Sequence, residues 1–456
     1  VLRNSFLALL SYCRLTRSSV TELLYHLDPL GYTDTPVAQI GADQAIEEVE
    51  LLFAVIKYGY AGYQFFGGDE AFGAARDRIL SGVGRNTGSM ATGELLNLIM
   101  DGLHFVQDGH FAVGGATPCK TFLLYADFSH EFVRNHKGEF VAADGRALIG
   151  AGGGSPPEYM KASISEAGDI VYVPGLLAPN DTQSISITLE FGDGGRQSVR
   201  LSPVCAEIPA TPGLPYKLSN LEGTPLAVCR LLGPVGDSAE SLDAFVRDAE
   251  RLWYESVVIL DLRSNPGGDS MLARQWCLHL TLKNPQPPGA SAELRTATAV
   301  TLRDNMRRLS GIGPGDGRWR SPLDPNNPGW SAISLSTEAF ATSKPLLVVL
   351  IDSYSASGTE HFVDSLRHMD NVVFIGTNTR GAYLTGNIGS FVLPHSRLRV
   401  SVPTQLQVVA NAPNMDGMGF LPDFWVAPEC ILDRTARFVR RHLVSSFRPE
   451  SSSEIP

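Results

Sequence analysis

Apolar residues recur at helical spacing through the first quarter of the chain. The pattern places an apolar side chain every three or four positions, as expected for helices with one buried face. It is carried by Leu23, Leu24 and Leu27, by Val49, Leu52 and Val55, and by Leu95, Leu96, Ile99 and Leu103. We therefore expect residues 1–110 to form a helical region, which ends where Gln107-Asp108-Gly109-His110-Phe111 leads into a strand.

A period of two replaces the helical pattern from residue 111 onward. Ile185–Phe191 alternates apolar and polar residues and runs into a glycine-rich turn at 192–195. Glycines at 150–154, followed by two prolines, are typical of a loop rather than of a phosphate-binding motif. These features predict a small β-rich domain over residues 111–224.

Continuous apolar runs distinguish the region 225–435. The runs are Val257–Leu260, Leu346–Ile351 and Val372–Ile375. Runs without alternation are typical of parallel strands buried on both faces, and helices fit between them at 269–282 and 357–369. We expect a parallel or mixed sheet, interrupted at 284–343 by an insertion that forms a lid, a binding loop or a disordered segment. Residues 436–456 are expected to be the end of a helix and a frayed polar tail.

Composition narrows the possible functions. The 456 residues are 43% hydrophobic and carry a net charge of −11, which argues against a nucleic-acid partner. No apolar run is long enough for a transmembrane segment, so we expect a soluble protein, either extracytoplasmic or cytoplasmic. The six cysteines form no CxxC pair and the histidines no HExxH motif, so no metal and no cofactor are expected.

Two segments of the α/β region carry residue types suited to catalysis. Asp261–Gly268 follows an apolar run and ends in Asn-Pro-Gly-Gly, a turn that can present backbone N–H groups to an oxyanion. Ser353–Glu360 follows another run and begins a helix, where the helix dipole favours negative charge. A serine at this position is more often an ordinary helix cap, and each segment alone is a weak signal.

Together with Ile375–Gly381 and Gly419–Asp423, these segments resemble the C-terminal-processing (tail-specific) peptidase family over about 225–430. The family pattern is Asp-x-Arg-x-Asn-x-Gly-Gly, Ser-Ala-Ser-x-x-Glu, Gly-x-x-Thr-x-Gly and a closing Gly-hydrophobic-x-Pro-Asp. The resemblance implies an α/β (α+β multidomain) protein with a ClpP/crotonase-like catalytic core, and a PDZ-like β-rich domain. It also implies that Ser357 is the nucleophile, with Ser353 and Ser355 as local competitors.

The general base predicted by the resemblance is a histidine. The tail-specific branch uses a lysine, but that position is Ala382, and the α/β region holds only Lys283 and Lys344 of the seven lysines in the chain. The tricorn-core branch instead uses a histidine just before the β domain, and Asp108-Gly109-His110-Phe111 is similar to that motif. We therefore expect His110 to activate Ser357, which would otherwise be a poor nucleophile.

The remaining members of the predicted site come from the same resemblance. The tricorn-core branch orients its histidine with a preceding serine, here Gly109, and with an acidic residue, here Asp416. Asp416 is expected to accept the imidazole N–H, and a turn-forming role is the alternative. The backbone N–H groups of Gly358 and of Gly267 or Gly268 are expected to hold the oxyanion.

The predicted reaction is hydrolysis of a peptide bond through an acyl-enzyme, acting on a peptide or protein substrate. Asp108 and Glu360 are interpreted as structural, the first supporting a turn and the second placing charge at a helix N-terminus. Two alternatives remain open: a catalytically inactive ligand- or peptide-binding module of the same fold, and an esterase or other acyl-transfer enzyme. The sequence leaves the oligomeric state open.

Overall fold

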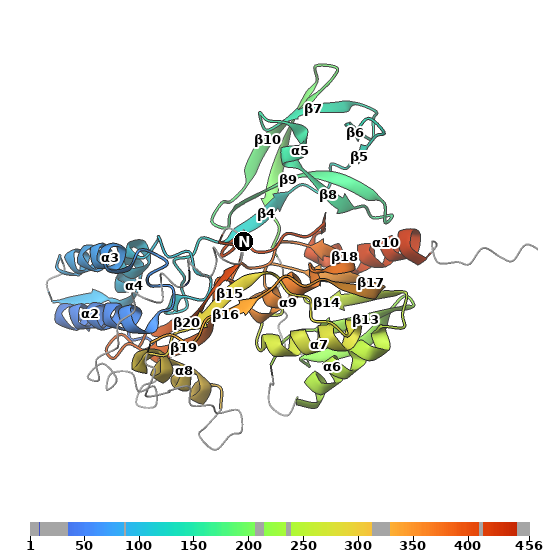
Figure 1. The fold of residues 1–456 in the computed structure, drawn as a ribbon. Helices are drawn as coiled ribbons and strands as arrows, with labels where there is room; N and C mark the ends of the chain where they lie inside the picture. The colour runs from blue at the N-terminus through green and yellow to red at the C-terminus, as the bar shows by residue number, and fades with distance from the viewer. Residues whose placement is uncertain are drawn as a thin grey trace, which may run out of the picture. The chain divides into compact units, whose positions relative to one another are not determined.

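The computed structural model of the chain describes residue 9 and residues 35–85, 88–205, 214–233, 239–311, 329–409 and 414–444 (Figure 1). The chain forms two compact units, each built from three separate segments. Unit 1 consists of Val1–Lys120, Pro287–Glu338 and Ala382–Gly417, and unit 2 of Thr121–Gln286, Ala339–Gly381 and Met418–Pro456. The helix expected around Leu23–Leu27 and the tail after residue 444 lie outside the described residues.

Helices dominate the N-terminal part of unit 1, as the apolar spacing predicts. They are α2 (Ala42–Gly59), α3 (Gly68–Val83) and α4 (Thr92–Gly102). The apolar faces of α2 and α4 are buried in one cluster, which includes Val49, Leu52, Leu95 and Ile99. Strand β1 (Gln39–Gly41) directly precedes α2, and strand β2 (Ser89–Ala91) directly precedes α4. The two strands form a short antiparallel pair.

A second part of unit 1 is an antiparallel sheet with a covering helix. Its strands follow the order β16 (Ser334–Ser336), β15 (Gly289–Glu293), β20 (Arg399–Val409) and β19 (Thr385–Val392), and β3 (Ala112–Val113) also pairs with β20. Helix α8 (Ala297–Leu309) contributes Leu302 to the same apolar cluster as α2 and α4.

The 284–343 insertion differs from its prediction, because its described part contains β15, α8 and β16 rather than only a loop. Thr296 caps α8 by accepting a hydrogen bond from the Ala299 N–H at 3.1 Å, and Leu302 is fully buried. The many prolines and glycines of this stretch conceal these local signals.

Unit 2 begins with a closed antiparallel sheet. Its strands are β4 (Phe122–Ala126), β5 (Phe132–Arg134), β6 (Phe140–Ala142), β7 (Ala147–Ala151), β8 (Met160–Ile164), β9 (Ile170–Pro179), β10 (Ile185–Phe191) and β11 (Arg196–Pro203), with the short helix α5 (Pro156–Tyr159) before β8. They follow the order β4-β11-β10-β7-β6-β5-β9-β8, and an additional β4–β9 pairing closes the ring. Inward-facing residues such as Leu189 and Leu201 fill its interior.

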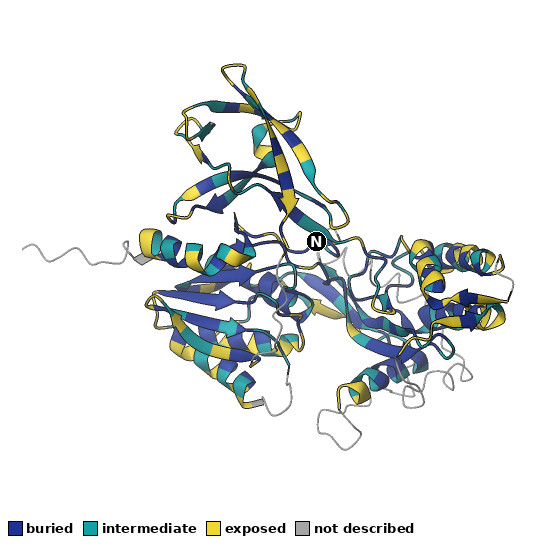
Figure 2. Ribbon diagram, turned by 180° about the vertical axis from the view of Figure 1, so that it is seen from behind, coloured by how far each residue is buried: buried dark blue, intermediate teal, exposed yellow. Residues whose placement is uncertain are grey.

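The second sheet of unit 2 contains the predicted parallel strands. The order is β12 (Tyr216–Leu221), β13 (Thr224–Cys229), β14 (Val257–Asp261), β17 (Ala341–Ile351), β18 (Met369–Gly376) and β21 (Phe424–Trp425), and all neighbours from β13 onward are parallel. Every residue of β14 is buried, as a strand covered on both faces requires (Figure 2). The mixed α/β fold class is therefore confirmed.

Helices cover both faces of this parallel sheet (Figure 1). On one face lie α6 (Ala239–Leu252), α7 (Ser270–Thr281) and α9 (Gly358–Leu366). Phe245 of α6 stacks on Trp276 of α7, and Phe362 of α9 meets both rings edge-on. On the other face, α10 (Ile431–Phe438) packs into the cluster that holds Ile259 and Val348. This layering fixes the strands and leaves their carboxyl ends free to carry loops.

Two further properties concern the described part of the chain. None of the helices found there combines the length and the apolar character that crossing a bilayer requires. Nor do three or more His, Cys, Asp or Glu side chains gather in those same residues as a group able to hold a metal ion.

Candidate active site

The predicted nucleophile segment and the glycine segment leave the same edge of the parallel sheet in unit 2. Strand β14 ends at Asp261 and pairs in parallel with β17, so that Asp261 lies opposite Leu350. The loops that follow the two strands, 262–268 and 352–357, therefore start side by side. In open α/β sheets, this carboxyl edge is where ligands bind.

Ser357 adopts a strained backbone conformation at the start of α9. Its φ is 55° and its ψ is −120°, a combination that non-glycine residues rarely adopt. Its side chain is partly exposed, whereas Ser355 is fully buried and donates a hydrogen bond from Oγ to the Leu262 carbonyl at 3.0 Å. Ser355 is thus committed to holding the loop, which favours Ser357 between these two serines.

The fully buried carboxylate of Glu360 holds this conformation. Its Oε2 accepts the Ser357 N–H at 3.1 Å, and its Oε1 accepts the Thr379 hydroxyl at 2.5 Å and the Gly381 N–H at 2.8 Å. Glu360 therefore ties the start of α9 to the loop after β18. The sequence predicted only that Glu360 places charge in the first turn of a helix. Its hydrogen bonds give it this further role of joining two loops.

A second buried carboxylate, Asp352, organises the turn before Ser357. Asp352 Oδ1 accepts the N–H groups of Ser264, Tyr354 and Ser355, each at 3.0 Å. The bond to Ser264 joins the glycine segment to the serine segment across the two strands. Sequence reasoning missed Asp352, and its only local signal is an aspartate directly after an apolar run.

Asp261 anchors the glycine segment by ion pairing. Its carboxylate lies 2.7 Å from the guanidinium nitrogens of both Arg230 and Arg263. Burial alone would raise the pKa of Asp261, but hydrogen bonds and charge attraction from Arg263 and Arg230 outweigh it and hold the pKa below its usual range. Asp261 thus stays ionised at neutral pH and fixes both arginines.

Gly267 and Gly268 allow the glycine segment to approach Ser357 closely. A Cβ on Gly267, whose φ is +105°, would lie 2.7 Å from the Ala356 carbonyl oxygen and 2.8 Å from the Ser357 Cβ. The Gly267 N–H donates to Asn265 Oδ1 at 3.0 Å. Within the described residues, the N–H groups of Gly268 and Gly358 have no hydrogen-bond acceptor, so these two suit an oxyanion best.

His110 lies in unit 1, between the end of α4 and β3. Its backbone N–H donates to Asp108 Oδ1 at 2.9 Å, and its side chain is mostly buried. Phe111, the next residue, is fully buried, and β3 pairs with β20. The imidazole is therefore held on a short, well-anchored loop.

The structure brings Asp416 to this same loop through backbone contacts. Asp416 Oδ2 accepts the Gly109 N–H, and Oδ1 accepts the N–H groups of Tyr383 and Leu384, each at 2.8 Å. These bonds tie the Gly109 loop to the start of β19. Asp416 thus reaches His110 through the preceding residue, a contact that the sequence motif alone did not predict.

Asp108 and Asp416 form a buried acidic pair. Burial, followed by the charge of Asp108, raises the pKa of Asp416 to about 8, against the effect of its three N–H donors. Burial also raises the pKa of Asp108, although hydrogen bonds from Tyr60, His110 and Thr385 oppose the shift. The two carboxyl groups therefore titrate as a coupled pair.

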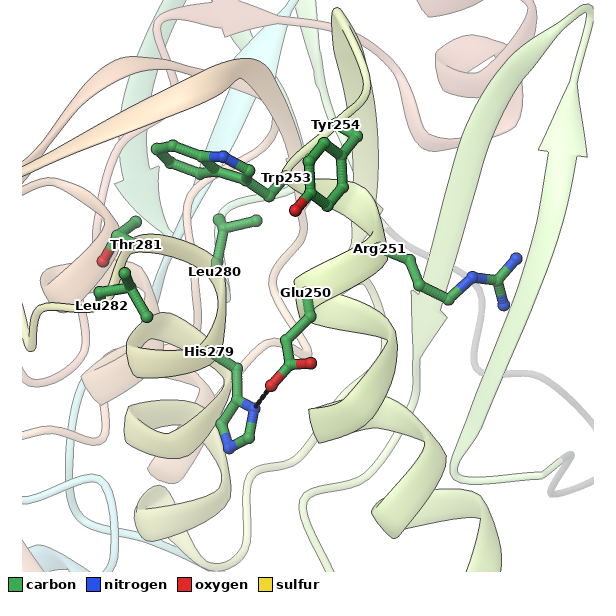
Figure 3. A pocket seen from close by; sticks show the side chains of 8 residues that line it. All are labelled: Glu250, Arg251, Trp253, Tyr254, His279, Leu280, Thr281 and Leu282. Atoms are coloured by element: carbon green, nitrogen blue, oxygen red, sulfur yellow. Dashed lines mark hydrogen bonds and ion pairs between the residues drawn. The ribbon is translucent and has the colours of Figure 1, made fainter.

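A cavity of about 580 Å³ lies elsewhere on unit 2, at the carboxyl ends of α6 and α7 (Figure 3). Trp253, Tyr254 and Leu280 line it, and the His279–Glu250 ion pair, 2.8 Å long, closes one side. The lining residues precede β14 or end α7, so they belong to the amino edge of the parallel strands. No predicted site residue takes part in this cavity.

We expect Glu360→Gln to destabilise the chain because an NH2 group replaces one of two buried acceptor oxygens. At least one of its hydrogen bonds is lost, so the free energy of unfolding should fall by about 1–3 kcal/mol in urea titrations. Glu70→Gln is the matched control, since it makes the same substitution at an exposed glutamate in the first turn of α3. Equal losses in the two variants would contradict the role assigned to Glu360.

The acidic pair predicts a pH-dependent stability. Below about pH 8 the folded chain keeps a proton on Asp416 that the unfolded chain has already released above about pH 4. The free energy of unfolding should therefore fall as pH rises from 4 to 8, by at most about 1.4 kcal/mol per pH unit for one proton. Asp416→Asn should make this decline shallower, and exposed Asp101→Asn should not. Urea titrations at several pH values measure the fall in the free energy of unfolding. An unchanged pH dependence in Asp416→Asn would contradict the raised pKa of Asp416.

Comparisons with known proteins concern the chain's family. Residues 227–426 match the model of peptidase family S41. No curated protein matches the chain.

Among solved structures, mature CPAF is 13% identical, with 90% of this chain and 99% of that chain covered and a TM-score of 0.46. The photosystem II D1 C-terminal processing protease is 12% identical, covering 87% and 96%, with a TM-score of 0.36. The tricorn protease is 12% identical, covering 85% of this chain and 35% of its own, with a TM-score of 0.37. Residues 227–426, which hold both the glycine segment and the serine segment, are thus similar to peptidase family S41.

Proposed function

We propose that this chain hydrolyses peptide bonds through an acyl-enzyme, with Ser357 as nucleophile and His110 as general base. The observation that carries the proposal is the conformation of Ser357. A serine with positive φ, fixed by Glu360 at a helix N-terminus, has the geometry of a nucleophile elbow. An ordinary helix cap has no need of this strain.

The groups around Ser357 suit the charge that develops in acyl transfer. As Ser357 Oγ attacks the substrate carbonyl, negative charge collects on the carbonyl oxygen. The N–H groups of Gly268 and Gly358 are proposed to bind that oxygen, and the N-terminus of α9 adds its positive dipole end. Gly268 suits this role better than Gly267, whose N–H already donates to Asn265.

His110 is proposed to move the proton in both half-reactions. It takes the Ser357 hydroxyl proton during attack and gives it to the leaving amine, which departs as the new amino terminus. In the second half it takes a proton from water, whose oxygen bonds to the acyl carbon, and returns that proton to Ser357. Ala382, at the position of the family lysine, is buried and apolar and cannot serve as a base.

The two aspartates of unit 1 are proposed to support His110. Asp416 holds the loop through the Gly109 N–H and Asp108 holds the His110 N–H, so that together they fix the position of the imidazole. No metal or cofactor enters the proposed steps. The substrate is proposed to be a peptide or protein, the class on which the family acts.

Labelling with a fluorophosphonate serine probe tests the proposal directly. We expect the wild type to be labelled, and Ser357→Ala and His110→Ala to lose the signal by about 10²-fold or more, since a general base contributes at least that much. Ser353→Ala and His104→Ala are the matched controls. Both residues neighbour the proposed catalytic ones in sequence, and both should retain labelling.

The other outcomes separate the alternatives. Labelling that is lost in Ser357→Ala and kept in His110→Ala would retain the nucleophile and refute the base. A folded wild type that takes no label and binds peptides would instead indicate the catalytically inactive binding module. Turnover of ester substrates without turnover of peptides would indicate an esterase.

A further inference from the structure

We propose that Thr385, together with Asp108, sets the tautomer of His110, so that Nδ1 carries the proton and Nε2 presents the lone pair. This inference rests on the proposed function, in which His110 acts as a base. It assigns positioning roles to two residues outside the predicted site. The feature that carries it is the direction of the hydrogen bonds around Asp108.

Asp108 is fully buried and accepts three hydrogen bonds. Its Oδ2 accepts the Tyr60 hydroxyl at 2.6 Å, and its Oδ1 accepts the Thr385 hydroxyl at 2.8 Å and the His110 backbone N–H at 2.9 Å. A backbone N–H can only donate, so Oδ1 acts as an acceptor. While Asp108 is ionised it can only accept, so the Thr385 hydroxyl proton is directed at Oδ1.

The Thr385 hydroxyl has one proton, and that proton points to Asp108. Its oxygen also lies 3.5 Å from Nδ1 of His110, at the long end of hydrogen-bond distances. Having no second proton, Thr385 can only accept from Nδ1. A hydrogen bond between these two atoms therefore runs from a protonated Nδ1 to Thr385, and in a neutral imidazole it leaves Nε2 with the lone pair that a general base needs.

The sheet of unit 1 places the Thr385 hydroxyl. Thr385 is the first residue of β19 and pairs with Leu406 of β20, and only 2% of its surface is exposed. The two residues before it donate their N–H groups to Asp416. Asp416 and Thr385 therefore act on the His110 loop from adjacent positions, the first through the backbone and the second through the side chain.

These contacts connect a carboxylate to the imidazole through a hydroxyl group. The titratable groups in these contacts are Tyr60, Asp108 and Asp416. Tyr60 faces the opposite oxygen of Asp108, and burial raises its pKa well above the usual range, so it remains a proton donor. The relay therefore runs from Asp108 through Thr385 to His110, and Tyr60 contacts only the far oxygen of Asp108.

Nitrogen-15 NMR of the full chain, with labelled histidine, tests the tautomer without depending on activity. The His110 signals are assigned by their loss in His110→Ala. Above the titration of His110, we expect a protonated Nδ1 and an unprotonated Nε2 in the wild type. Thr385→Val should mix the two tautomers, and Thr385→Ser, which restores the hydroxyl, should return the wild-type signals.

Tyr60→Phe is the matched control because it removes a donor from Asp108 but leaves the bond between Thr385 and Asp108. It should keep the wild-type tautomer, and thermal unfolding monitored by circular dichroism confirms that each variant is folded. A wild type with the proton on Nε2, or a folded Thr385→Val with unchanged signals, would overturn the inference.

Fluorophosphonate labelling, measured in parallel, separates this inference from the proposed function. We expect labelling of Thr385→Val to slow by roughly tenfold, part of what a general base contributes, and Thr385→Ser to recover. If labelling does not depend on His110 but the tautomer follows Thr385, the proposed base is wrong and the inference stands. If labelling depends on His110 while Thr385→Val keeps both its rate and its signals, the inference alone fails.

Discussion

One buried carboxylate, that of Glu360, determines the conformation of the candidate nucleophile. A carboxylate without exposed surface is costly unless hydrogen bonds compensate for its lost hydration. Glu360 recovers them from a hydroxyl and from two backbone N–H groups on separate loops, so these groups must converge on it. The strain at Ser357 persists because releasing it would leave the buried Oε2 of Glu360 without its donor. The burial of Glu360 and the positioning of Ser357 therefore depend on the same hydrogen bonds within unit 2.

The same principle operates in unit 1 with a different result. Asp108 and Asp416 also accept backbone N–H groups, but the two carboxyl groups are close enough to repel each other. Burial, together with this repulsion, favours keeping a proton on the pair, whereas the equally buried Asp261 is kept ionised by two arginines. Three buried aspartates of one chain thus differ in protonation because of their partners, not because of their depth.

The sequence predicted those helices and strands in which a single hydrophobic period or one continuous apolar run extends over the whole element. The buried strands around Val258, Leu347 and Val373 and the helix containing Leu52 were identifiable because every residue there serves one packing surface. Helix α8 was missed because it lies among prolines and glycines. Ser357 and His110 were selected by family motifs, because the hydrophobic pattern of the chain does not distinguish a partly exposed serine or a lone histidine from its neighbours. The roles of Asp352, Thr385 and Tyr60 could not be predicted, because their partners are set by pairing between distant strands.

The division of the chain into units has a consequence for its biosynthesis. Unit 1 includes Ala382–Gly417 and unit 2 ends with Met418–Pro456, so neither corresponds to a continuous stretch. During translation, the N-terminal helices leave the ribosome long before strands β19 and β20, on which part of their cluster depends. Neither unit can be prepared by simple truncation. The chain must close contacts between residues hundreds of positions apart, which slows folding and prolongs the exposure of apolar surface.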